Sequence, residues 1–198
     1  GIGMAFGNMG NIYEYRGDYA KALELYQKHL DICEELDDKR GQSMSFGNLG
    51  NAYFAQGEHE KAADFYKQAI EIDQAMKLAP HLCEHMFSLS SLLFAQNKIE
   101  EARPLTQQAM DFAQKIGIRD IAFKASVLHQ KINNDSAKLQ AMLNEGPLNE
   151  EQTASLHYEL WKMTQKQEYG EKAKTLYQKI YQRTPNIQYK MRLAELDK

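Results

Sequence analysis

GQSMSFGNLGNAYFAQGEHEKAADFYKQAIEIDQA, residues 41–75, contains two stretches with helical spacing of apolar residues, separated by a glycine. The same arrangement occurs forty residues earlier and forty residues later. Small and large residues return in phase at the aligned positions Gly10, Gly50 and Ser90; Tyr13, Tyr53 and Leu93; and Ala22, Ala62 and Ala102. A fixed period of 20–50 residues is typical of a solenoid. The sequence therefore predicts an all-α solenoid of antiparallel helix pairs.

Glycine occurs at two kinds of position in this repeat. Gly10 and Gly50 fall inside predicted helices, where glycine costs about 1 kcal/mol relative to alanine. We therefore expect close packing of the paired helices at these two positions. Gly17 and Gly57 follow the first helix of each pair, where a left-handed residue is common. These two glycines predict the turn between the paired helices.

The repeated residues resemble the tetratricopeptide repeat (TPR) family. The resemblance is carried by a large residue, a leucine-like residue and a glycine, followed by a tyrosine, a turn glycine and the second-helix residues: Phe46, Leu49, Gly50, Tyr53, Gly57, Ala62, Tyr66 and Ala69. The forty-residue spacing resembles the long-helix subclass found in polarity adaptors and bacterial signalling regulators. The resemblance implies a right-handed superhelix of roughly 10–11 helices.

Three regular TPR units are predicted at residues 1–40, 41–80 and 81–117. Residues 118–198 are expected to form degenerate TPR-like helices and a C-terminal capping helix, continuous with the first part. Gly1 stands at a repeat boundary, and the first repeat is as regular as the second. A solenoid normally begins with an atypical polar repeat. We therefore expect the sequence to be a fragment of a longer protein.

Composition excludes several classes of protein. No apolar run approaches the 18–20 residues of a membrane span, and residues 1–8 lack the pattern of a signal peptide. The net charge is −3, and no basic–aromatic motif indicates nucleic-acid binding. Cys33 and Cys83 show no paired spacing, so we expect two reduced thiols. The expected location is cytoplasmic, without membrane or nucleic-acid partners.

The segment HLCEH, residues 81–85, is the nearest approach to a metal motif. His81 and His85 are one helical turn apart, and two histidines with this spacing can share a zinc ion. A structural site needs about four ligands, and the sequence supplies no others with clear spacing. We therefore expect an exposed polar helix start here, no metal and no cofactor. No nucleophile–histidine–acid constellation is evident, so we expect no enzymatic activity.

A stripe of residues along the first helix of each pair is the candidate binding site. By resemblance to TPR proteins, this face lines a concave groove that holds peptides. Asparagine offers both donors and an acceptor for an extended peptide backbone, and phenylalanine offers apolar anchors. Packing within the solenoid remains an alternative role for these side chains. The predicted stripe is Asn8, Asn11, Tyr15, Met44, Asn48, Asn51, Phe54, Phe87, Ser91 and Phe94.

Two functions are compatible with these features. The first is a non-catalytic scaffold that binds a peptide or helix of a partner protein in the groove. The second is a regulatory module of a larger signalling protein, such as a kinase, cyclase or transcription regulator. That module would contact a neighbouring domain or self-associate, including as a homodimer, through the first repeat around Phe6 and Ile12. The two hypotheses place the contact surface differently.

Overall fold

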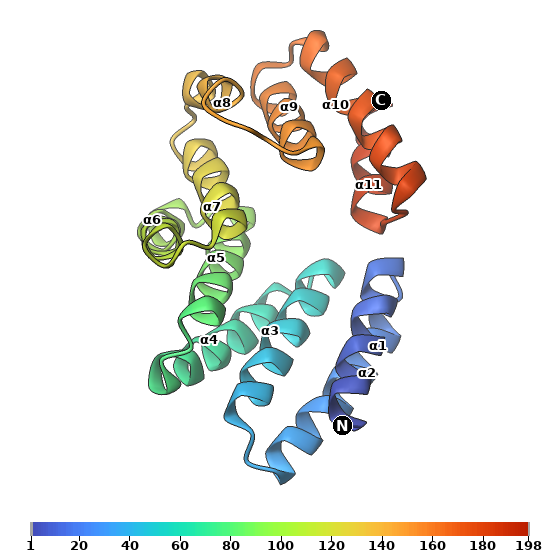
Figure 1. Ribbon diagram of the computed structural model, residues 1–198, viewed down its shortest axis with the longest axis vertical. Helices are drawn as coiled ribbons and strands as arrows, with labels where there is room; N and C mark the ends of the chain where they lie inside the picture. The colour runs from blue at the N-terminus through green and yellow to red at the C-terminus, as the bar shows by residue number, and fades with distance from the viewer. Residues whose placement is uncertain (1, 198) are drawn as a thin grey trace. The chain divides into compact units, whose positions relative to one another are not determined.

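The computed structural model describes residues 2–197, which form eleven α-helices and no strands (Figure 1). The helices are α1 (Ile2–Arg16), α2 (Tyr19–Glu35), α3 (Lys39–Gln56), α4 (His59–Met76), α5 (Ala79–Ala95), α6 (Ile99–Ile116), α7 (Arg119–Ile132), α8 (Ser136–Met142), α9 (Glu150–Thr164), α10 (Gln167–Arg183) and α11 (Ile187–Leu196). This confirms the predicted all-α architecture. Among the described helices, none is long and apolar enough to span a bilayer.

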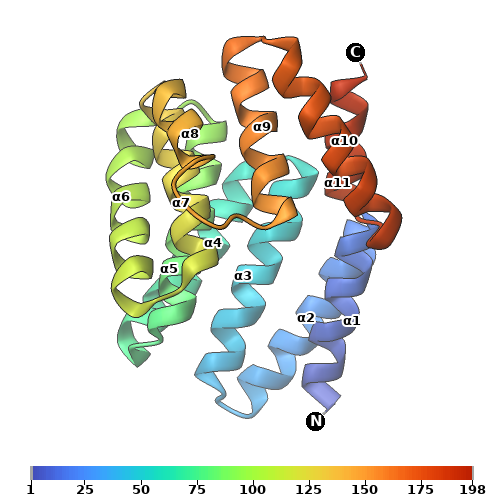
Figure 2. The same cartoon turned by 45° about the horizontal axis from the view of Figure 1, so that its top comes forward.

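The chain divides into two compact units, one extending to Leu128 and the other starting at His129. In the first unit, the pairs α1/α2, α3/α4 and α5/α6 follow one another, as Figures 1 and 2 show. Helix α1 also packs closely against α3, and α3 against α5, whereas the described residues of α2 and α4, and likewise of α4 and α6, do not bring the two backbones this close. The first helices of the pairs are therefore closer together than the second helices.

Local signals define the helix ends of the first unit. Gly17, Gly57 and Gly117 have φ values of 83°, 83° and 78°, in the left-handed region that ends a helix. At two helix starts, Asp18 and Asp38 accept a hydrogen bond from the backbone N–H three residues further on. The glycine turns predicted from the sequence are thus confirmed.

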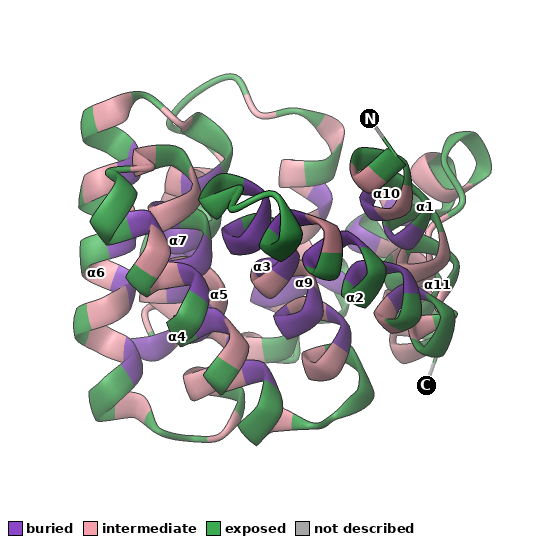
Figure 3. Cartoon of the chain, turned by 90° about the horizontal axis from the view of Figure 1, so that it is seen from below, coloured by how far each residue is buried: buried purple, intermediate pink, exposed green. Residues whose placement is uncertain are grey.

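The two in-helix glycines leave room for tyrosine rings. A Cβ on Gly10 would lie 2.4 Å from the Tyr26 ring, and one on Gly50 would lie 2.6 Å from the Tyr66 ring. Both tyrosines are almost completely buried. Figure 3 shows the buried residues along the inward faces of the helices. The close packing expected at these glycines is therefore a tyrosine ring of the second helix lying against the backbone of the first.

The second unit is stabilised by contacts among its last three helices. Tyr158 and Tyr177 pack edge to face, and the Arg192 guanidinium lies 5.3 Å and 5.2 Å from their ring centroids. The Tyr158 hydroxyl donates to Glu195 over 2.7 Å. These contacts join α9, α10 and α11 around a small aromatic core.

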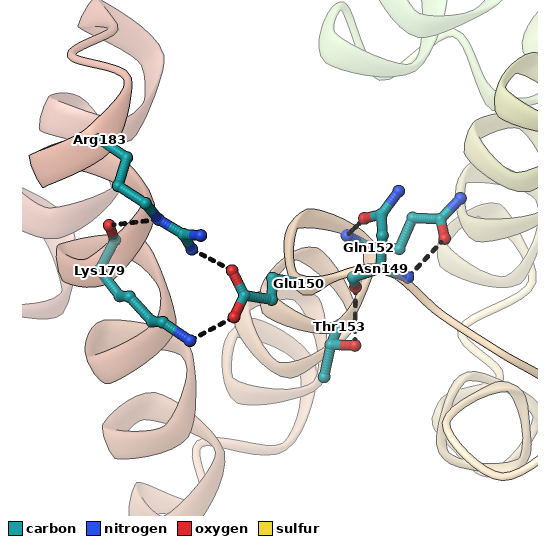
Figure 4. Close-up of polar contacts among 6 residues, drawn as sticks. All are labelled: Asn149, Glu150, Gln152, Thr153, Lys179 and Arg183. Atoms are coloured by element: carbon teal, nitrogen blue, oxygen red, sulfur yellow. Dashed lines mark hydrogen bonds and ion pairs between the residues drawn. The ribbon is translucent and has the colours of Figure 1, made fainter.

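Hydrogen bonds and ion pairs are concentrated at the start of α9 (Figure 4). Asn149 and Gln152, three residues apart, have the spacing of a capping box. They form one, with reciprocal hydrogen bonds between side chain and backbone. Glu150 forms ion pairs with both Lys179 and Arg183 of α10. A carboxylate in the first turn is favourable to the helix dipole. The same residue therefore stabilises the start of α9 and its packing on α10.

Two helix starts differ from those that the sequence predicts. Leu78, Ala79 and Pro80 predict a break between helices, but α5 begins at Ala79, so Pro80 lies in its first turn. Proline is tolerated in the first turn because the backbone N–H groups there have no acceptor within the helix, so its missing N–H costs nothing. The repeat pattern over residues 171–185 predicts a helix that starts at residue 171. Helix α10 begins four residues earlier, at Gln167.

Candidate functional site

The predicted stripe lies on α1, α3 and α5, of which α3 contacts both of the others. Its members differ in exposure. Four are exposed, namely Asn8, Asn11, Tyr15 and Met44. Six are half-buried, namely Asn48, Asn51, Phe54, Phe87, Ser91 and Phe94. The stripe therefore combines accessible polar groups with apolar side chains that also take part in packing.

Two of the asparagines are held in place by tyrosines of the partner helix. The Tyr26 hydroxyl lies 2.8 Å from Asn11 Oδ1, and the Tyr66 hydroxyl donates to Asn51 Oδ1 over 2.7 Å. A carboxamide retains two N–H donors when its oxygen is occupied. The two amides are thus oriented by the same buried tyrosine in successive repeats, with their donors left for another partner.

Glu14 shares the first of these tyrosines. Its carboxylate lies 2.6 Å from the Tyr26 hydroxyl. Burial raises the pKa of Glu14, and the hydrogen bond from Tyr26 opposes that shift. Burial and the nearby Glu14 charge raise the pKa of Tyr26, so its hydroxyl remains a donor. Tyr26 therefore organises two polar groups of α1.

Asn48 differs from its neighbours on α3. It is half-buried, and its side chain makes no hydrogen bond to another described residue. The Ser91 hydroxyl, by contrast, donates a hydrogen bond of 2.9 Å to the carbonyl oxygen of Phe87 in the same helix. No polar atom of the Asn48 side chain is both buried and unbonded, so this amide is accessible to a partner from outside the chain.

Gly7 and Gly47, which border the stripe, accommodate histidines. A Cβ on Gly7 would lie 3.1 Å from His29 Nδ1, and one on Gly47 would lie 2.1 Å from His85 Nε2. Both glycines are buried. A glycine on the stripe either lets a ligand approach closely or lets another part of the chain pack against it. The space at Gly47 is filled by a side chain of this chain.

His85 is not part of an exposed helix start, which corrects the expectation from the sequence. It is 6% exposed, and its Nδ1 donates to Asp73 Oδ2 over 2.7 Å. The other Asp73 oxygen accepts a hydrogen bond of 2.5 Å from Ser43. We call Ser43, Asp73 and His85 the buried polar triad. It joins α3, α4 and α5, and the sequence pattern did not predict it.

His29 is also buried and lies within hydrogen-bond distance of a serine. The Ser45 hydroxyl lies 2.9 Å from both His29 Nδ1 and the Gly41 carbonyl oxygen. Burial lowers the pKa of His29, against a smaller opposing effect of Asp38. In the described part of the chain, no group of three or more histidine, cysteine, aspartate or glutamate side chains could hold a metal ion. The buried histidines thus connect neighbouring helices.

Residues 1–75 match a family model described as tetratricopeptide repeat. None of the curated proteins matches the chain in sequence. Among solved structures, the Rap conjugation gene regulator of plasmid pLS20, in complex with the Phr* peptide, has a TM-score of 0.73 at 15% identity. That similarity covers 95% of this chain and 55% of the regulator, so the chain spans about half of that protein.

Two further structures have the same fold. A kinesin light chain TPR-like repeat protein of Podospora anserina has a TM-score of 0.62 at 16% identity, covering 92% of this chain and 97% of that one. BtubC of P. vanneervenii has a TM-score of 0.64 at 17% identity, covering 97% of this chain and 80% of that one. Residues 1–75 thus match the tetratricopeptide repeat model, and the helix pairs share the fold of these solved structures.

Proposed function

We propose that the chain is a non-catalytic scaffold that binds an extended peptide segment of a partner protein along the stripe on α1, α3 and α5. The carrying observation is the repeated orientation of Asn11 and Asn51 by buried tyrosine hydroxyls. Each amide keeps two donors, and the two side chains are forty residues apart in the repeat. Such a row of fixed donors suits the regularly spaced carbonyls of a peptide backbone.

Apolar groups beside these amides supply the second requirement of a peptide site. Met44 is 41% exposed, and Phe54, Phe87 and Phe94 are half-buried along the same helices. Methionine adapts to different partner side chains because its thioether chain is flexible and polarisable. The Rap regulator, whose structure is similar to this chain, was solved in complex with the Phr* peptide, which supports the proposal at the level of the fold.

Asn48→Ala tests this function most directly. We expect peptides selected from a random display library on the wild-type chain to bind the variant about tenfold more weakly, since one hydrogen bond of about 1.4 kcal/mol is lost. Fluorescence anisotropy measures the Kd. Gln68→Ala, an exposed position on α4, serves as the matched control. Equal affinity of all three proteins for the selected peptides would contradict the proposal.

A second candidate function is favoured by exposed apolar residues on α1. Ile2, Met4, Met9 and Ile12 are 75%, 67%, 45% and 51% exposed. The positions equivalent to Met9 and Ile12 are covered by the preceding helix pair in later repeats. Leu49 and Ala52 pack with Tyr26 and Leu30, and Leu89 and Leu92 pack with Ala62 and Tyr66. An exposed apolar helix face of this kind suits an interaction surface.

Under this alternative, the α1 face mediates self-association or contact with a neighbouring domain. Phe6, one of the residues expected to form this surface, is half-buried, and the Lys28 ammonium lies 5.9 Å from its ring. The more exposed Met9 and Ile12 are therefore better positions for a test.

For the self-associating form, we expect Met9→Ser with Ile12→Ser to convert a concentration-dependent dimer into a monomer. The substitutions remove the apolar area that an isologous α1 interface would bury. Sedimentation equilibrium over a range of concentrations measures the mass. Met76→Ser, at an equally exposed methionine on α4, is the control. A wild-type chain that stays monomeric throughout would remove self-association from consideration.

A further inference from the structure

A cavity of about 570 Å³ lies between α4 and α6, away from the stripe. Its apolar lining includes Ala63 of α4, Leu93 of α5, and Pro104 and Leu105 of α6. Helices α4, α5 and α6 all contribute residues to its lining. Binding sites for small ligands have volumes in the range of about 300–1,000 Å³. This cavity is therefore large enough for a partner side chain.

The equivalent space between α2 and α4 is filled by aromatic rings. The rings of Tyr53 and Phe65 stack with centroids 5.4 Å apart and an angle of 3° between their planes. The Phe46 ring stacks on Phe65 at 6.0 Å, and the Lys61 ammonium lies 5.3 Å from the Tyr53 centroid. These side chains pack with Leu23 against the buried core of that repeat.

Every one of these apolar positions is smaller or aliphatic one repeat later. Forty residues on, Leu23, Phe46, Tyr53 and Phe65 become Ala63, Met86, Leu93 and Leu105. Aromatic side chains bury larger areas than aliphatic ones, and their flat rings stack. The cavity is thus a site where the repeat has lost its own aromatic stack. An aromatic ring from outside would occupy the equivalent space and pack against Leu93 and Leu105.

Polar groups at the cavity define the kind of ring. The carboxylates of Glu60, Asp64 and Glu101 line it together with the ammonium groups of Lys67 and Lys98. Glu101 stands where the preceding repeat has Lys61 above its tyrosine. A carboxylate only accepts hydrogen bonds and an ammonium group only donates them, whereas a phenolic hydroxyl does both. The lining therefore favours an aromatic ring that carries a hydroxyl.

We propose that the cavity between α4 and α6 receives a tyrosine side chain of a partner protein. Its ring takes the place of the stack that Tyr53 and Phe65 form one repeat earlier, and its hydroxyl donates to Asp64 or Glu101. The site is separate from the stripe on α1, α3 and α5. The scaffold would therefore contact its partners on two faces.

N-acetyl-L-tyrosinamide is the probe for this site, titrated into the full chain with ¹³C-labelled leucine methyls. We expect shifts of the Leu89, Leu93 and Leu105 methyls with a Kd on the order of 1 mM, as suits one buried side chain. N-acetyl-L-phenylalaninamide should bind several-fold more weakly because it lacks the hydroxyl. Equal shifts with N-acetyl-L-leucinamide, or no shift with the tyrosine probe, would overturn the proposal.

Filling the cavity from within provides the decisive comparison. Leu93→Tyr with Leu105→Phe restores the residues of the preceding repeat, and Ala63→Leu restores its leucine. We expect either variant to keep its helical circular dichroism and to weaken tyrosine binding at least tenfold, measured at the Leu89 methyls. Asn48→Ala on the stripe should bind the probe as the wild-type chain does. Undiminished binding by both folded filling variants would overturn the assignment.

Discussion

Replacing Asp73 by alanine is expected to lower the free energy of unfolding by about 3–5 kcal/mol. Asp73 is fully buried and accepts hydrogen bonds from Ser43 over 2.5 Å and from His85 over 2.7 Å. Alanine would leave both donors in the core without a partner, and burying an unpaired polar group is costly. Because the triad joins three helices, its loss also weakens the packing between the second and third repeats.

Urea denaturation followed by circular dichroism measures this effect. Asp64→Ala is the matched control, since Asp64 is exposed on the same helix and forms no ion pair with another described residue. We expect the control to stay within about 0.5 kcal/mol of the wild-type chain. A similar small effect for Asp73→Ala would show that the triad contributes little beyond the surrounding apolar contacts.

The helices of this protein were predictable because their ends are encoded locally. The repeat pattern predicts helices at about residues 59–76, 99–116 and 119–132, which are the limits of α4, α6 and α7. Gly57 precedes the first of these helices, and Gly117 lies between the other two. The close helix contact at Gly50 was also predictable, because glycine inside a helix has a cost that only packing explains. These features need no knowledge of distant contacts.

The buried polar triad was harder to predict because Ser43 and Asp73 are thirty residues apart, out of phase with the repeat. One signal was present. Aligned by the forty-residue period, Asp73 falls at the position of Cys33 and Ala113, both buried. A carboxylate at a core position indicates a hydrogen-bonded partner. The identity of that partner depended on how α5 packs against α3, which the sequence pattern does not specify.

The cavity between α4 and α6 could likewise be predicted only in part from the sequence. The change from Tyr53 and Phe65 to Leu93 and Leu105 was visible in the aligned repeats. Smaller side chains leave an opening only where the surrounding helices fail to collapse around them. In this chain a space lined by residues of α4, α5 and α6 remains.

Gly47→Ala is expected to destabilise the chain by about 1–3 kcal/mol, although alanine is the better helix former by about 1 kcal/mol. Its Cβ would lie 2.1 Å from His85 Nε2, and the imidazole is held on its other side by Asp73. In a His85→Ala background the same substitution should become neutral or stabilising, because the ring is absent. Urea denaturation of the four proteins measures this coupling. If Gly47 served a ligand instead, Gly47→Ala would retain full stability and lose only peptide binding.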